Sequence, residues 1–234
     1  MLVERRVDGV LIVLIHGVED ELVAIRQTGV QAVLLNANEG DEMVSTIGTD
    51  NMRGGALATR HLLGLNHRRV GYIGGARTIS ACRDRLGGYL RAHERANVPV
   101  DPTLVIEDLS GLDAVREAVH GLLDLAHPPT ALFAVNDEFA MAVLQALAER
   151  GRRVPDEMAV VGFDTIPLAA WLSVPLTTVA QPKEEQGRLA ADLLIDHIEQ
   201  PDLPIRHVSL QSRLVVRQSC GARGAQTKGG DAAS

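Results

Sequence analysis

The sequence has few cysteine, basic and aromatic residues, and each shortage argues against a class of protein. It contains two cysteines in 234 residues, Cys82 and Cys220, and neither stands in a spacing typical of a metal or redox site. A disulfide-rich secreted fold is therefore excluded, and we expect a reducing, cytoplasmic setting with no metal and no cofactor. The apolar run at residues 10–15 is too short to span a membrane.

Basic and aromatic residues are also scarce. Lysine and arginine number 23 against 30 aspartates and glutamates, which gives a formal net charge of −7. Because phosphate contacts need clustered basic side chains, a DNA-binding surface spread over this chain is not expected. Aromatic residues make up 3% of the chain and hydrophobic residues 46%, so the core must consist of Leu, Val, Ile and Ala. This composition is typical of parallel sheets covered by helices.

Short apolar segments alternate with amphipathic helical segments along the chain. Residues 30–35, 130–135 and 158–164 are typical of buried strands, and residues 183–199 predict a long amphipathic helix. The alternation predicts an α/β protein with parallel sheets flanked by helices and joined by right-handed crossovers. Residues 176–179 are β-branched and lie between Pro175 and Pro182, which favours a short extended segment that crosses between lobes.

Polar residues recur where the expected strands end. Asn36, Asn136, Asp137 and Asp164 each follow such a strand. Each could contact a ligand or could be a helix N-cap or turn former, which is what Asn and Asp at such points usually are. Their shared position favours a ligand site, because open α/β sheets bind ligands beyond the carboxyl ends of their strands. Arg85, on a helix after a glycine-rich loop, could clamp a ligand or be solvated.

Signatures of catalysis and of nucleotide binding are weak. No serine lies in a Gly-x-Ser-x-Gly turn, and no two histidines have the helical spacing of metal ligands. The glycines of residues 71–75 lack the spacing of a dinucleotide or P-loop motif. We therefore expect no enzyme and no catalytic residue. Trp171, the single tryptophan, is expected to pack near the boundary between lobes.

Seven ordered motifs resemble the ligand-sensing domain of the lactose-repressor (LacI) family of bacterial transcription regulators. They are Val7-Asp8-Gly9-Val10, Thr49-Asp50-Asn51 with Gly54-Gly55-Ala56, His61-Leu62-Leu63 to Val70, Arg85-Leu86-Gly87-Gly88-Tyr89, Phe133-Ala134-Val135-Asn136-Asp137, residues 153–182, and Leu214-Val215-Val216-Arg217-Gln218-Ser219-Cys220. Each motif is weak alone, but the ordered set covers nearly all of residues 4–220.

The resemblance implies a two-lobed, periplasmic-binding-protein-like fold of type I. The N-terminal lobe would comprise residues 1–67 and 181–208, and the C-terminal lobe residues 69–178 and 211–220. Crossings between the lobes would fall near residues 67–69, 179–181 and 208–212, with His67, Arg68, Val179, Ala180 and Gln181 as hinge residues. Residues 221–234 form a polar Gly- and Ala-rich tail that we expect to be disordered.

The resemblance also implies a small-molecule effector, a sugar or related metabolite, bound in the cleft between the lobes. The residues expected to contact it are Asn36, Arg85, Leu109, Asn136, Asp137 and Asp164. Leu109 stands where several family members have an aromatic ring that stacks on the ligand. A homodimer is the expected assembly.

Family members bind operator DNA through an N-terminal helix-turn-helix headpiece and a hinge helix. This sequence has no counterpart of these segments, nor of the first two strand-helix units that precede Val7-Asp8-Gly9-Val10. We therefore expect an incomplete N-terminal lobe with an uncovered sheet edge, and no specific operator binding by this chain alone. The alternative is a solute-binding protein of a transport system, which shares the fold and carries a secretion signal.

Overall fold

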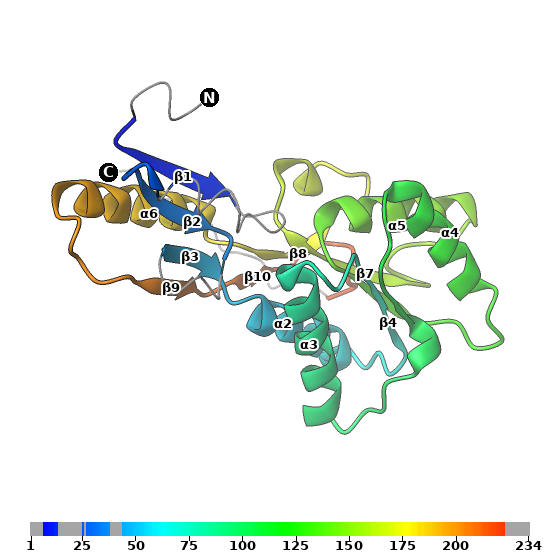
Figure 1. The fold of residues 1–234 in the computed structure, drawn as a ribbon. Coiled ribbons are helices and arrows are strands. Elements are labelled where there is room, and N and C mark those ends of the chain that lie inside the picture. Colours follow the sequence, from blue (N-terminus) through cyan, green and yellow to red (C-terminus); the bar gives the residue numbers. More distant parts are fainter. Residues whose placement is uncertain (1–6, 14–24, 26, 38–43, 223–234) are drawn as a thin grey trace, which may run out of the picture.

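The chain forms one parallel and one mostly parallel sheet with helices against them, in two lobes placed end to end (Figure 1). The computed structural model describes residues 7–13, 25, 27–37 and 44–222. The first sheet has four parallel strands in the order β1 (Gly9–Val13), β2 (Gln31–Leu35), β3 (Ser45–Thr49) and β9 (His207–Leu210). Helix α6 (Lys183–Glu199) packs against β1, β2 and β3. We call this part the four-stranded lobe.

The second sheet has six strands and forms the six-stranded lobe. Their order is β10 (Arg213–Val215), β8 (Thr177–Ala180), β7 (Ala159–Asp164), β6 (Ala131–Ala134), β4 (Val70–Ile73) and β5 (Val105–Ile106). All neighbours are parallel except β10, which runs antiparallel to β8. The parallel α/β fold predicted from the alternation of segments is confirmed.

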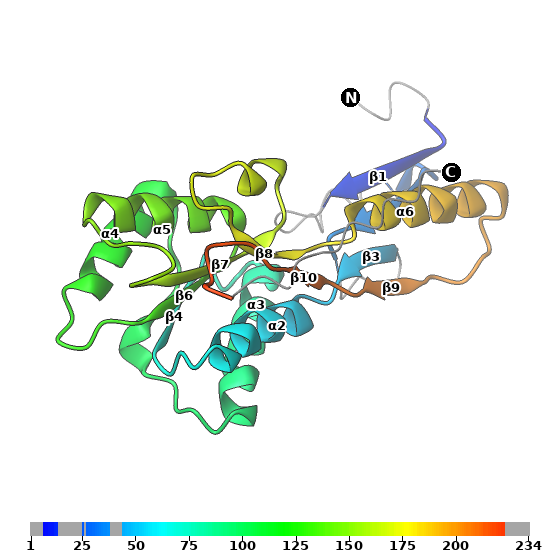
Figure 2. The same ribbon diagram turned by 180° about the vertical axis from the view of Figure 1, so that it is seen from behind.

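Four helices and two short 3-10 helices complete this lobe. They are α2 (Asn51–Gly64), α3 (Ser80–Arg95), α4 (Leu112–Leu123), α5 (Asp137–Glu149), η2 (Pro102–Leu104) and η3 (Pro167–Ala170). The helices α2 and α3 cover one face of the sheet, and α4 and α5 cover the other, as the two opposite views show (Figures 1 and 2).

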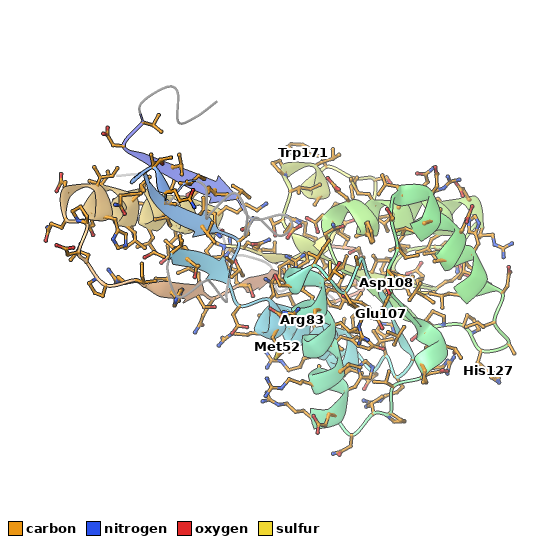
Figure 3. The ribbon with its side chains drawn as sticks, in the orientation of Figure 1. Met52, Arg83, Glu107, Asp108, His127 and Trp171 are labelled. Atoms are coloured by element: carbon orange, nitrogen blue, oxygen red, sulfur yellow. The ribbon has the colours of Figure 1, made fainter. Side chains whose placement is uncertain are left out.

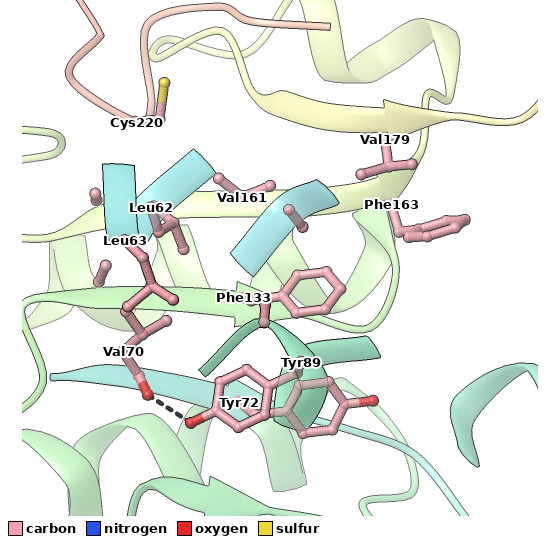
Figure 4. Packing of buried hydrophobic residues seen from close by; sticks show 14 of the residues in the cluster. Leu62, Leu63, Val70, Tyr72, Tyr89, Phe133, Val161, Phe163, Val179 and Cys220 are labelled. Atoms are coloured by element: carbon pink, nitrogen blue, oxygen red, sulfur yellow. Dashed lines mark hydrogen bonds between the residues drawn. The ribbon is translucent and has the colours of Figure 1, made fainter. Parts of the chain in front are cut away.

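The central strands β4, β6 and β7 of the six-stranded lobe are buried on both faces, which explains their nearly continuous apolar sequences. Phe133 and Val161 belong to the core cluster beneath α2 and α3, whereas their neighbours Leu132 and Val160 belong to the cluster beneath α4 and α5. Alternate side chains of a strand point to opposite faces, so each strand serves both clusters. Figure 4 shows the first cluster, in which the hydroxyl of Tyr89 donates to the carbonyl oxygen of Val70 at 2.8 Å.

The chain passes between the lobes at three places. Two agree in position with the expected crossings: Gln181 and Pro182 join β8 to α6, and Gln211 and Ser212 join β9 to β10. The first crossing differs. Helix α2 packs against α3 and against strands of the six-stranded sheet, so the chain crosses at Asp50, between β3 and α2, rather than at residues 67–69.

The hinge residues expected around the first crossing therefore lie inside one lobe. His67 and Arg68 lie between α2 and β4, and His67 Nδ1 lies 3.0 Å from the hydroxyl of Thr130, directly before β6. An amphipathic helix between two lobes can pack on either one, and its sequence alone does not say which. Of the remaining hinge residues, Val179 and Ala180 belong to β8 and Gln181 follows it.

Strand β3 was missed because its sequence is polar. Ser45 and Thr46 are fully buried, with hydroxyls 2.8 Å from His197 Nε2 and 3.0 Å from His207 Nδ1. These hydrogen bonds satisfy the buried hydroxyls, so a strand without an apolar pattern can occupy the interior.

Trp171 was wrongly expected to pack near the lobe boundary, since it is 84% exposed beside η3. Within the described part of the chain, no helix is long and apolar enough to cross a membrane.

Candidate functional site

A polar cavity of about 360 Å³ lies where the two lobes meet. It is lined by Val13, Leu35 and Asn36 from the four-stranded lobe, by Asp164 and Gln181 from the six-stranded lobe and its crossing, and by Lys183, Gln186 and Gly187 from α6. The strands β1, β2 and β7 end at this cavity, as expected for a ligand site in open parallel sheets.

Asp164 ends β7 and presents its carboxylate to the cavity. Its backbone has a φ of 106° and that of Thr165 a φ of 54°, so two successive non-glycine residues occupy a region that L-residues avoid. Such strained positions persist where the surrounding structure fixes them, and they concentrate at ligand sites. Here the backbone N–H of Thr165 donates to the Thr178 hydroxyl at 3.3 Å. The Asp164 side chain is 25% exposed and accessible from the cavity.

Arg85 lies behind Asp164 and positions its carboxylate. The Arg85 side chain is only 8% exposed, and its guanidinium donates to Asp164 Oδ1 at 3.2 Å, to Asn51 Oδ1 at 2.9 Å and to the Val135 carbonyl oxygen at 2.7 Å. Its Cζ also lies 3.7 Å from the centre of the Phe163 ring. These contacts fix Arg85 in one orientation. Its contribution to the cavity is to position the carboxylate of Asp164.

Two glutamines hold the polar groups of the cavity, and one of them, Gln181, joins the two lobes. Gln181 Nε2 donates to Asp164 Oδ1, while Gln181 Oε1 accepts from the Thr49 hydroxyl at the end of β3 at 3.0 Å. Gln186, in the first turn of α6, donates to Asn36 Oδ1 at 3.0 Å and to the Ile47 carbonyl oxygen at 3.1 Å. The polar groups expected to meet a ligand are thus held by side chains of the second crossing and of the helix that follows it.

Besides Arg85, three other expected contact residues do not line this cavity. Asn136 is the N-cap of α5, with Oδ1 accepting from the Phe139 backbone N–H at 2.8 Å. Leu109 is half-buried against the core beneath α4 and α5. Asp137 is fully buried, and its carboxylate accepts from the Thr178 hydroxyl at 2.6 Å and from the Ile166 backbone N–H at 2.8 Å. Burial raises the pKa of Asp137 to about 6, although both hydrogen bonds oppose the change.

The structure adds residues that the sequence patterns did not indicate. Lys183 and Gln186 line the cavity because α6 begins at its edge, and they lie one helical turn apart on the same side. The signal available was the position of Lys183 directly after the extended segment and Pro182. No group of three or more His, Cys, Asp or Glu side chains suited to a metal ion occurs among the residues that the structure describes.

Comparisons with known proteins agree with this geometry. Residues 59–220 match the family model of a periplasmic binding protein-like domain. The HTH-type transcriptional repressor PurR of Aliivibrio fischeri strain ES114 is 33% identical over 227 residues, covering 95% of this chain and 67% of that protein. PurR of Photobacterium profundum is 31% identical over 221 residues, covering 94% and 66%. The chain therefore spans about two thirds of the length of these relatives.

Solved structures with the same fold include regulators with bound sugars. The complex of the transcriptional regulator CelR with cellobiose is 35% identical, with a TM-score of 0.84 over 93% of this chain and 67% of that one. A LacI family transcriptional regulator from Enterococcus faecium with bound ribose is 28% identical, with a TM-score of 0.84 over 94% and 81%. The match extends over both lobes of the described structure.

Proposed function

Because this chain belongs to the LacI family of transcriptional regulators, whose effector-binding domain is periplasmic-binding-protein-like, we propose that it senses a small molecule for a bacterial regulator. The observation that carries the proposal is the polar cavity between the lobes, with Asp164 at a strand end and Gln181 in a crossing. The similar proteins are regulators, which favours this function over that of a transport solute-binding protein. We expect no catalytic activity.

The effector we propose is a sugar or a closely related polyhydroxy metabolite. The Asn36 and Gln181 amides, the Asp164 carboxylate and the Lys183 ammonium group supply both acceptors and donors for hydroxyl groups. A cavity of about 360 Å³ lies within the range of small-molecule sites. The lining residues that the structure describes offer amide, carboxylate and ammonium groups and no aromatic ring, which favours recognition by hydrogen bonds over ring stacking.

Effector binding would change the arrangement of the lobes through Gln181. In the present structure Gln181 bridges Asp164 and Thr49, which belong to different lobes. An effector hydroxyl that donates to Asp164 competes with the Gln181 amide and weakens this bridge. A ligand shifts such an equilibrium only by its difference in affinity for the two arrangements, and this competition supplies one.

The partners of the whole regulator belong to the same proposal. Operator DNA would be bound through a helix-turn-helix headpiece, in a cytoplasmic protein that acts as a homodimer. Support for self-association comes from η3, where Leu168 is 53% exposed and Trp171 84%. Figure 3 shows Trp171 on the outside of the lobe, where a second copy could cover it.

A panel of sugars that includes ribose and cellobiose tests the proposal. We expect one of them to raise the melting temperature of the protein and to bind with a stoichiometry of one in isothermal titration calorimetry. The substitution Asp164→Asn should weaken that binding at least tenfold, because it removes the charged acceptor. The matched control is Asp156→Asn, which makes the same change at a carboxylate that is 71% exposed. Equal affinities for both variants would place the site elsewhere.

A further inference from the structure

A second groove, outside the interlobe cavity, lies between α2 and α3. It has a volume of about 330 Å³ and is lined by Asp50, Met52, Arg53, Ala56, Leu57, Arg60, Arg91 and Arg95. Four of these eight residues are arginines, two from each helix, in a chain whose formal net charge is −7. We propose that this groove binds a small molecule that carries two or more phosphate groups.

The groove is built by an unusually close approach of the two helices. A Cβ atom on Gly88 would lie 2.1 Å from the Met52 carbonyl oxygen, and one on Gly55 would lie 2.2 Å from the Arg85 carbonyl oxygen. Only glycine allows backbones to come this near. This close helix–helix contact brings the arginines of α2 and α3 to one surface. Their backbone positions are fixed by the two helices and not by a loop.

The four guanidinium groups lack ion-pair partners within the described structure. No carboxylate of those residues lies within 4.0 Å of Arg53, Arg60, Arg91 or Arg95, whereas many other arginines of the chain are paired. Asp50, the carboxylate that lines the groove, accepts the Arg53 backbone N–H at 2.8 Å as the N-cap of α2. The groove therefore concentrates positive charge that the protein does not itself neutralise.

Phosphate is the anion that this arrangement fits best. Arginine presents a planar fork of donors that matches two phosphate oxygens, and arginines on facing helices can each take a separate phosphate group. Met52, Ala56 and Leu57 provide an apolar part of the lining for the organic portion of the ligand. Met52 lies at the junction of the two helices in Figure 3, and its sulfur is 3.1 Å from Arg91 Nη1.

The groove is separate from the effector cavity and borders the first crossing between the lobes, at Asp50. The two sites share no lining residue. Asp50 lies in the chain segment between the lobes, and its backbone N–H donates to the Leu210 carbonyl oxygen of β9 at 2.9 Å. The proposal stands whether or not a sugar binds in the cavity, because none of its evidence comes from there.

Calorimetric titration with inorganic pyrophosphate at low ionic strength tests the proposal. We expect saturable binding to one site, and an affinity at least about tenfold lower in the double variant Arg91→Gln/Arg95→Gln, which loses the charges of α3. The matched control is Arg206→Gln/Arg213→Gln, which removes the same charge at two exposed arginines outside the groove. Retained binding in the control supports the site; absent binding, or equal losses in both variants, overturns it.

Two further titrations distinguish a built site from general attraction of anions. Orthophosphate should bind at least about tenfold more weakly than pyrophosphate, because one phosphate cannot engage both helices. Asp50→Asn should tighten pyrophosphate binding with little change in stability, since asparagine caps helices as well as aspartate does and the variant removes a negative charge. Equal affinities for the two anions, or unchanged binding in Asp50→Asn, would contradict the proposed groove.

Discussion

The buried carboxylate of Asp137 should make the stability of this protein depend on pH. Burial raises its pKa from the ordinary 3.8 to about 6, so the folded state holds the proton more tightly than the unfolded state does. The contribution of protonated Asp137 is therefore fully present below pH 3.8 and is lost as the pH rises through about 6. A pKa difference of one unit corresponds to about 1.4 kcal/mol, so the rise in the pKa of Asp137 corresponds to about 3 kcal/mol of stability.

The substitution Asp137→Asn should abolish this loss. An asparagine amide can accept the Ile166 N–H and donate to the Thr178 hydroxyl, so it reproduces the bonds of the protonated acid without a charge. Urea unfolding of both proteins between pH 4 and pH 7.5 gives the two free energies of unfolding. Subtracting one free energy from the other removes the contribution of all other titrating groups. As the pH rises over this range, the free energy of unfolding of the unmodified protein should fall by up to about 3 kcal/mol relative to that of the variant.

Parallel pH profiles of the two proteins would refute this reasoning. They would show that the Asp137 carboxylate is ionised in the folded state as easily as in the unfolded state, and that the two hydrogen bonds outweigh the cost of burial. The variant Asp156→Asn provides the comparison for an exposed carboxylate, and its profile should follow that of the unmodified protein.

Two substitutions and one control test the packing that holds the site in place. Gly88→Ala should cost about 1–3 kcal/mol in chemical denaturation, because the added Cβ meets the Met52 carbonyl oxygen, whereas Gly121→Ala, with open space around it in α4, should stabilise the protein by up to about 1 kcal/mol. Ser219→Ala should cost about 1–3 kcal/mol in the same assay, because the fully buried hydroxyl donates to the Val160 carbonyl oxygen at 2.6 Å. Losses of similar size for both glycines, or none for Ser219, would contradict these contacts.

Local patterns predicted most helices and strands because their apolar residues follow the period of the element. The helix expected at residues 183–199 has these bounds in the structure. Asp50 is the N-cap of α2, a position that aspartate favours. The same patterns could not assign α2 to a lobe, because its apolar face fits either sheet. They also missed β3, whose buried hydroxyls find partners on residues distant in sequence.

The candidate site was partly predictable for a similar reason. The rule that ligands bind at strand ends identified Asn36 and Asp164, which the fold brings to one cavity from different lobes. It could not separate them from Asn136 and Asp137, which also follow a strand but cap a helix or lie beneath the surface. Side-chain direction and depth decide that difference, and neither is visible in the pattern of residue types.

The central claim is that a sugar-like effector binds at Asp164 in competition with Gln181. A crystal structure of the protein with the effector found in the sugar panel tests it most directly. We predict a ligand hydroxyl within hydrogen-bond distance of the Asp164 carboxylate, and a Gln181 amide moved away from it. A ligand bound elsewhere, or one in the cavity with the bond between Gln181 and Asp164 intact, would contradict the account.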